Sequence, residues 1–159
     1  MSMRTKHLAT MALLISLILP TACSTEDTST AEQTAVRFYK EVWVNGNDKA
    51  AKSMLAEPKK TQELHKPMQQ VKNEATQNPA IWVVKSPTDH QMGTRTILIY
   101  RPSDKRDYKV RLYKTQGTWK VISFQQNFDP KEGGYASFEA YQRLSSEYPD
   151  LKWKKIDNP

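Results

Sequence analysis

A change of hydrophobic period near residue 79 constrains the fold of this chain most strongly. From Thr30 to Asn78, apolar residues recur three and four positions apart, as on one face of an α-helix. From Ala80 to Gln126, apolar and polar residues alternate, which is typical of β-strands. A run of helices followed by a run of strands predicts an α+β fold, with N-terminal helices packed on an antiparallel sheet.

Capping and helix-breaking residues divide the helical part. Ser29 or Thr30 can cap the first helix through a capping box, and a glycine between two asparagines ends it. Asp48 can then cap a short second helix. Pro58 suits the first turn of a third helix, in which Pro67 should introduce a kink or a break.

The alternating part predicts four strands joined by hairpins. The expected strands are 80–85, 94–101, 108–114 and 119–126. Apolar residues occur on both faces of the second and fourth strands, so part of the face away from the helices must also be covered. A helix over 135–148 and a final strand or extended arm over 151–156 are expected to follow.

The N-terminus has the pattern of a secretory signal. A short basic segment precedes an uncharged apolar run, Leu8 to Leu19, and Pro20 ends that run. The run is about 12 residues long, against the roughly 20 that a membrane-spanning helix needs. We therefore expect this segment to direct export and then to be removed.

The residues Ala22-Cys23 resemble the end of a bacterial lipoprotein signal peptide. The resemblance implies a signal peptide at residues 1–22, lipidation of Cys23 and a tether at 23–29. It also implies a cell-envelope location facing the periplasm or the exterior, with membrane lipid as a partner through the acylated Cys23. Ser24, where Asp would retain the protein at the inner membrane, allows outer-membrane delivery in a cell with two membranes. The alternative is a plain secretory signal followed by a free thiol.

Two short motifs resemble the nuclear transport factor 2-like fold. One is Phe38-Tyr39 followed by Gly46-Asn47-Asp48, and the other is the Gly-x-Trp-x-Val run at residues 117–124. The resemblance implies a curved, cone-like sheet around the helices, formed by residues 30–126. Its closest match in kind is the group of small bacterial lipoproteins of unknown function with this fold. Residues 127–159 depart from the pattern, as a C-terminal helix and arm packed on or beside the domain.

Candidates for chemistry are few. Asp89-His90 could titrate near neutrality, but it lies between Pro87 and Gly93, as in a solvated hairpin tip. His65 has the surroundings of a surface helical residue. We expect no catalytic residue, no metal and no cofactor, because the sequence has no ligand spacing, nucleophile motif or phosphate loop.

Basic residues gather in one predicted hairpin of a chain whose formal net charge is +7. Lys105, Arg106, Lys109 and Arg111 can contact anionic lipid headgroups or acidic wall polymers. Lysines also keep exposed sheet edges soluble, which is the structural alternative. Nucleic acid is not expected as a partner of a secreted protein.

Aromatic residues gather in the C-terminal segment. Tyr135, Phe138, Tyr141 and Trp153 either pack on the open side of the sheet or form a binding face for a partner. Together these patterns predict an envelope lipoprotein that binds a ligand or a protein partner without catalysis. The alternatives are an assembly or scaffold subunit of an envelope or secretion complex, and an isomerase- or dehydratase-like enzyme that uses the cone.

Overall fold

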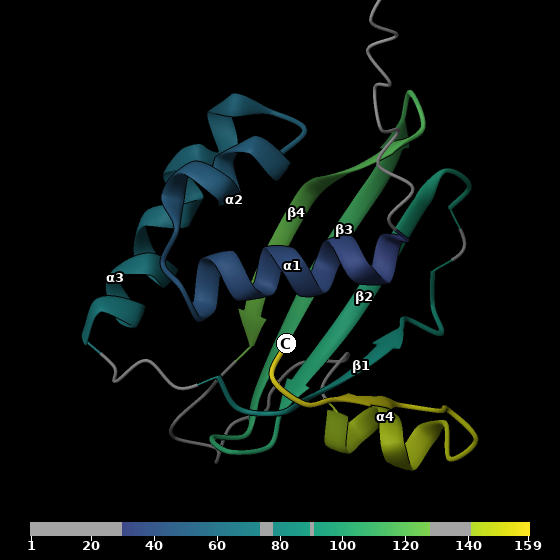
Figure 1. Cartoon of the computed structure of the whole chain (residues 1–159). Helices are drawn as coiled ribbons and strands as arrows, with labels where there is room; N and C mark the ends of the chain where they lie inside the picture. Colours follow the sequence, from purple (N-terminus) through teal and green to yellow (C-terminus); the bar gives the residue numbers. More distant parts are fainter. Residues whose placement is uncertain (1–29, 74–77, 90, 128–140) are drawn as a thin grey trace, which may run out of the picture.

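A computed structural model describes residues 30–73, 78–89, 91–127 and 141–159 (Figure 1). These residues form an α+β fold in which helices pack on an antiparallel sheet. The helical elements are α1 (Ala31–Trp43), α2 (Asp48–Met54), the 3₁₀ helix η1 (Pro58–Leu64), α3 (His65–Asn73) and α4 (Tyr141–Glu147). The strands are β1 (Ile81–Lys85), β2 (Thr94–Arg101), β3 (Arg106–Thr115), β4 (Thr118–Asn127) and β5 (Lys154–Ile156).

The sheet has the strand order β4-β3-β2-β1-β5. Strands β1 to β4 form the predicted meander of antiparallel hairpins. The expected final strand or arm is a strand, because β5 pairs antiparallel with β1 and places Ile156 opposite Ile81. The last residues of the chain therefore complete the edge of the sheet.

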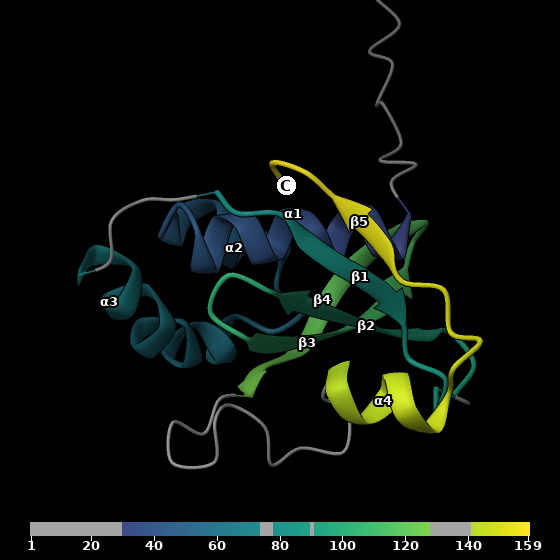
Figure 2. The ribbon, with the colours of Figure 1, turned by 90° about the horizontal axis from the view of Figure 1, so that it is seen from below.

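Helices cover both faces of the sheet. Figure 2 shows α1 on one face and α4 on the other. In β2, Ile97 and Ile99 pack into the core beneath α1, whereas Leu98 belongs to a second cluster with Leu144 of α4. This alternation confirms that the second face of β2 is covered.

The first helix forms as its sequence predicts. Thr30 is the N-cap: its Oγ1 accepts from the Gln33 N–H at 3.1 Å, and Gln33 Oε1 accepts from the Thr30 N–H at 2.8 Å. This reciprocal pair is a complete capping box. The stripe of Ala35, Phe38, Tyr39 and Val42 is fully buried.

Strand β3 begins at Arg106, two residues before its expected start at 108. Three boundaries of the helices also differ from the expectation. Asn47, not Asp48, caps α2, because its Oδ1 reaches the Ala50 N–H at 3.2 Å. The expected third helix divides at Leu64 into η1 and α3, three residues before Pro67. The C-terminal helix ends at Glu147, and its expected start lies outside the described residues.

Strand β4 lies at one edge of the sheet, and the chain after α2 protects part of that edge. Leu55 forms an isolated parallel bridge with Val121, and the Ala56 N–H donates to the Val121 carbonyl at 2.8 Å. This contact brings α2 beside β4. None of the helices in the described part of the chain combines the length and the apolar composition needed to cross a bilayer.

Candidate functional site

Aromatic rings fill the space between α1 and the sheet. Ring centroids of neighbouring residues lie 4.8 to 6.1 Å apart, with edge or tilted geometry. The rings belong to Phe38, Tyr39, Trp43, Tyr108 and Phe124. A ligand in the middle of the fold would therefore have to displace packed side chains.

One charge is buried among these rings. Arg101, which is 6% exposed, donates from Nε to Asp104 Oδ1 at 2.8 Å and from Nη2 to Asp104 Oδ2 at 2.6 Å. Its guanidinium also lies 5.3 Å from the centre of the Tyr108 ring. Burial opposes the charge, but the Asp104 hydrogen bonds and the adjacent phenols raise the pKa of Arg101 above its usual value. For Tyr39 and Tyr108, burial disfavours the charged phenolate and therefore raises the pKa.

A carboxyl group is buried on the opposite face of the sheet. Asp107 is 2% exposed, and its Oδ1 accepts from the Tyr141 N–H at 3.0 Å, at the start of α4. Its Oδ2 has no hydrogen-bond partner among the described residues. Burial, only partly opposed by the Tyr141 hydrogen bond, raises the pKa of Asp107 to about 7.

Two of the C-terminal aromatics, Tyr141 and Trp153, pack on the sheet. Tyr141 stacks on Tyr100, with ring centroids 4.3 Å apart and an interplanar angle of 3°. Trp82 and Trp153 contact the Tyr141 ring edge-on, with ring centroids 5.5 and 4.9 Å from it. Two residues of the expected binding face, Tyr141 and Trp153, thus come together. The other two, Tyr135 and Phe138, lie outside the described residues, as does Cys23.

The four basic residues expected to contact anionic surfaces do not share one surface. Lys105 is exposed in the β2–β3 turn, and Arg106 Nε lies 3.0 Å from Asp104 Oδ2. Lys109 and Arg111 instead project from the α4 face of β3 and line a polar hollow of about 450 Å³. Arg111 hydrogen-bonds there to Gln91.

The other candidates for chemistry lie apart from one another. Asp89 is in the polar hollow, where its Oδ2 accepts from the Thr96 N–H at 2.8 Å. Its sequence neighbour His90 lies outside the described residues, and His65 is exposed at the start of α3. Within the described ranges, no group of three His, Cys, Asp or Glu side chains could hold a metal ion.

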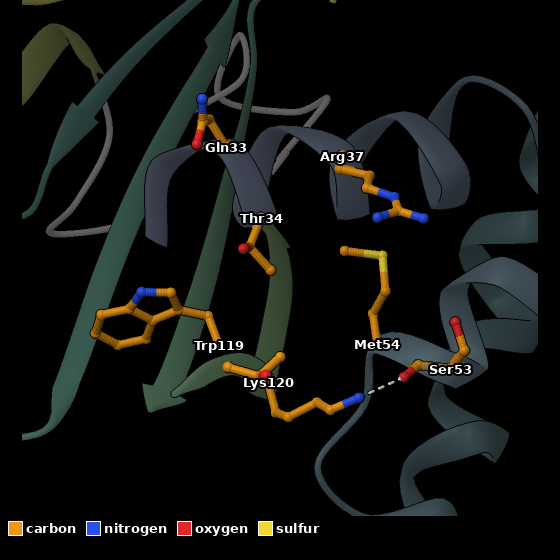
Figure 3. Close-up of a pocket in the computed structure, with 8 residues that line it drawn as sticks. Gln33, Thr34, Arg37, Ser53, Met54, Trp119 and Lys120 are labelled. Atoms are coloured by element: carbon orange, nitrogen blue, oxygen red, sulfur yellow. Dashed lines mark hydrogen bonds between the residues drawn. The ribbon is translucent and has the colours of Figure 1, made fainter. Parts of the chain in front are cut away.

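A pocket of about 350 Å³ lies where α1, α2 and the start of β4 meet (Figure 3). Its volume is within the range of small-ligand sites. The first two turns of α1, the last turn of α2 and the first residues of β4 line it: Gln33, Thr34, Arg37, Ser53, Met54, Thr118, Trp119 and Lys120.

The pocket combines positive charge with apolar walls. In Figure 3 the Met54 side chain extends between Arg37 above and Lys120 below. Lys120 Nζ donates to the Ser53 carbonyl at 2.9 Å, which holds the ammonium at the rim. The described residues that line the pocket include no Asp or Glu. Such a lining suits an anionic group attached to an apolar one.

Sequence reasoning did not single out this pocket. It indicated only that Trp119 and Lys120 begin the expected strand 119–126. A lysine beside a tryptophan at the start of a strand was the available signal. Nothing local to either segment indicated that α1 and α2 would meet it.

Comparison of the chain with protein-family models, with curated proteins and with solved structures finds no match. Functional inference for this chain therefore rests on its own residues.

Proposed function

We propose that this chain is a lipid-anchored cell-envelope protein whose nuclear transport factor 2-like domain binds an anionic group of a ligand or partner, without catalysis. The signal-like residues 1–22 and the acceptor Cys23 support export and anchoring. The helix-then-meander order and the α+β fold support the domain assignment. The binding site is the pocket between α1, α2 and β4.

The observation that carries this proposal is the charge of the pocket. Arg37 and Lys120 approach it from elements far apart in the sequence, and Met54 lies between them. Two cations beside apolar side chains repel each other, and an anion bound near both offsets this repulsion. A bound phosphate, sulfate or carboxylate supplies that anion, and the thioether and indole accept the apolar part of the ligand.

The two alternatives have less support. A scaffold that docks through its C-terminal segment would need an exposed apolar face there. Among the described residues of that segment, Tyr148 is exposed, but Leu144 is 0% exposed and Tyr141 stacks on the sheet. An enzyme using the cone would need space beneath α1. Packed rings occupy the middle of that space, and a hollow of about 470 Å³ remains at its end, between Trp43, α3 and Phe124 of β4.

Binding and anchoring can be tested on the same preparation. The chain is expressed in a bacterium supplied with radioactive palmitate, and the acylated protein is purified in a neutral detergent. We expect label on the wild type and none on Cys23→Ser. In calorimetry, phenyl phosphate should bind the labelled protein and phenol should not. Lys120→Gln should weaken binding about tenfold, because it removes a charged hydrogen-bond donor.

Lys105→Gln is the matched control, because it removes one exposed lysine from a distant turn. Equal loss of affinity in Lys105→Gln and Lys120→Gln would show that binding follows net charge and not the pocket. An unlabelled wild-type chain would contradict the anchoring half of the proposal.

A further inference from the structure

A second hollow lies on the other side of α1. It has a volume of about 290 Å³, and Val36 of α1 lines it together with Ile156 and Pro159 of the C-terminal segment. Gln33 and Arg37 line both this hollow and the pocket described above. Both residues are exposed, and together they form a ridge that separates the pocket, called the first hollow below, from the second hollow.

The charges around this ridge are mainly positive. Lys40 and Lys154 line the second hollow, and Lys120 lines the first. Glu32 is the acidic residue lining the second hollow, and it is engaged by Lys154 at 2.7 Å. Arg37 and Lys40 have no acidic partner in the part of the chain that the structure describes. We call Arg37, Lys40, Lys120, Lys154 and the two hollows the α1 surface.

We infer that the α1 surface rests against the anionic phospholipid headgroups of the membrane that holds Cys23. This inference rests on the proposed function and names the partner of its pocket. Phosphates accept hydrogen bonds from Arg37 and the lysines, and the hollows accept the glycerol and upper acyl parts of the lipid. Trp119, half-buried at the edge of the first hollow, has the amphipathic ring that suits a membrane interface.

The tether favours this surface over others. Cys23 and Thr30 are seven residues apart in the sequence, so the acylated end lies at most about 25 Å from the start of α1. Gln33 and Arg37 are in the first two turns of that helix. Anchoring keeps the α1 surface at a high effective concentration near the bilayer, so weak contacts suffice.

Three basic residues of the β2–β3 hairpin are placed differently. Lys109 and Arg111 project from the opposite face of the sheet, beside α4. Lys105 is in the turn between β2 and β3. Contact of the α1 surface with the bilayer therefore turns α4 away from it, and this orientation can be measured.

The test uses the acylated full protein reconstituted into vesicles. One fluorophore is attached at Ser53→Cys, on the rim of the first hollow, or at Ser146→Cys, exposed on α4. Acylation occupies Cys23, the one native cysteine, so each label is unique. Energy transfer to a headgroup-labelled lipid reports which label is nearer the bilayer.

On phosphatidylglycerol vesicles at low salt, we expect at least twofold more transfer from position 53 than from position 146. The difference should disappear in about 0.5 M NaCl and on phosphatidylcholine vesicles, because screening removes charge attraction. Arg37→Gln/Lys40→Gln should abolish it, whereas Lys66→Gln/Lys105→Gln, with the same net charge, should keep it.

Equal transfer from both positions on phosphatidylglycerol would overturn the inference. If phenyl phosphate still binds in that case, the proposed function stands without its lipid partner. Loss of the orientation on adding soluble poly(glycerol phosphate) at equal phosphate concentration would assign the surface to an acidic wall polymer instead. If the chain is not acylated, salt-dependent sedimentation of the secreted protein with phosphatidylglycerol vesicles would support the surface alone, and no sedimentation would overturn it.

Discussion

At the scale of single residues, Asp107 depends most strongly on tertiary structure. The sequence placed Asp107 just before the expected strand 108–114, and nothing there indicated a special role. Folding buries it beneath the start of α4, where one oxygen meets the Tyr141 N–H and the other has no described partner. A protonated carboxyl suits this position better than a carboxylate, because burial penalises the charged form.

Stability should therefore fall as the pH rises from about 4 to about 7. In this window the unfolded Asp107 has lost its proton (pKa about 3.9), while the folded residue, whose pKa is about 7, still holds it. The loss should be on the order of 4 kcal/mol for this group, at about 1.4 kcal/mol for each unit by which the pKa is raised. Asp107→Asn mimics the neutral carboxyl and should remove this component from urea midpoints measured between pH 4 and pH 8.

The control for this prediction is Asp150→Asn, because Asp150 is exposed near the end of α4. Its pH profile should match that of the wild type. A wild-type profile that rises over the same window, with Asp107→Asn unchanged from it, would show that the carboxyl ionises freely in the folded protein.

At the scale of elements, the C-terminal segment forms a second layer on the sheet. Leu144 of α4 is fully buried against Leu98 and Val84, and β5 pairs with β1. The apolar residues on both faces of the second strand predicted that something must cover the far face. They did not specify which segment would do so, because many amphipathic helices can cover the same stripe.

Leu144→Ala should cost about 2–5 kcal/mol of unfolding free energy, measured by urea denaturation, because it leaves a cavity between α4 and the sheet. Gln142→Ala, on the exposed side of the same helix, should change stability by less than about 0.5 kcal/mol. Equal and small effects of both substitutions would mean that α4 contributes little to the cooperative fold.

At the scale of the whole molecule, the chain has two packed layers on one sheet. The four tryptophans report on both layers. Trp43 and Trp119 belong to the α1 face, and Trp82 and Trp153 to the α4 face. The expected domain ended at residue 126, but β5, at residues 154–156, belongs to the same sheet as β1 to β4.

We expect the two layers to unfold together. In Trp82→Phe/Trp153→Phe, fluorescence reports the α1 face, and in Trp43→Phe/Trp119→Phe it reports the α4 face. Within each variant, the urea midpoint by fluorescence should equal that by far-ultraviolet circular dichroism, because a single sheet connects the layers. A lower fluorescence midpoint for the α4 face alone would identify residues 141–159 as a separate unit.

The sequence by itself determined the order of elements, the antiparallel meander and the capping box of α1. Each of these depends on residues within a few positions of one another, or on a period that one segment carries. The predicted cap of α2 was wrong because two neighbouring residues, Asn47 and Asp48, can both cap this helix. The signal peptide and the lipidated Cys23 remain predictions of the same local kind.

Only the tertiary structure decided which side chains share a site. Arg37 and Lys120 meet at one pocket because the chain after α2 bridges to Val121, which brings β4 beside both helices. The basic residues of the β2–β3 hairpin do not share one surface, because neighbours in a strand point to opposite faces of the sheet. Asp107 becomes buried because α4 folds over it. Charge and pKa at these positions depend on distances through space, which no local pattern encodes.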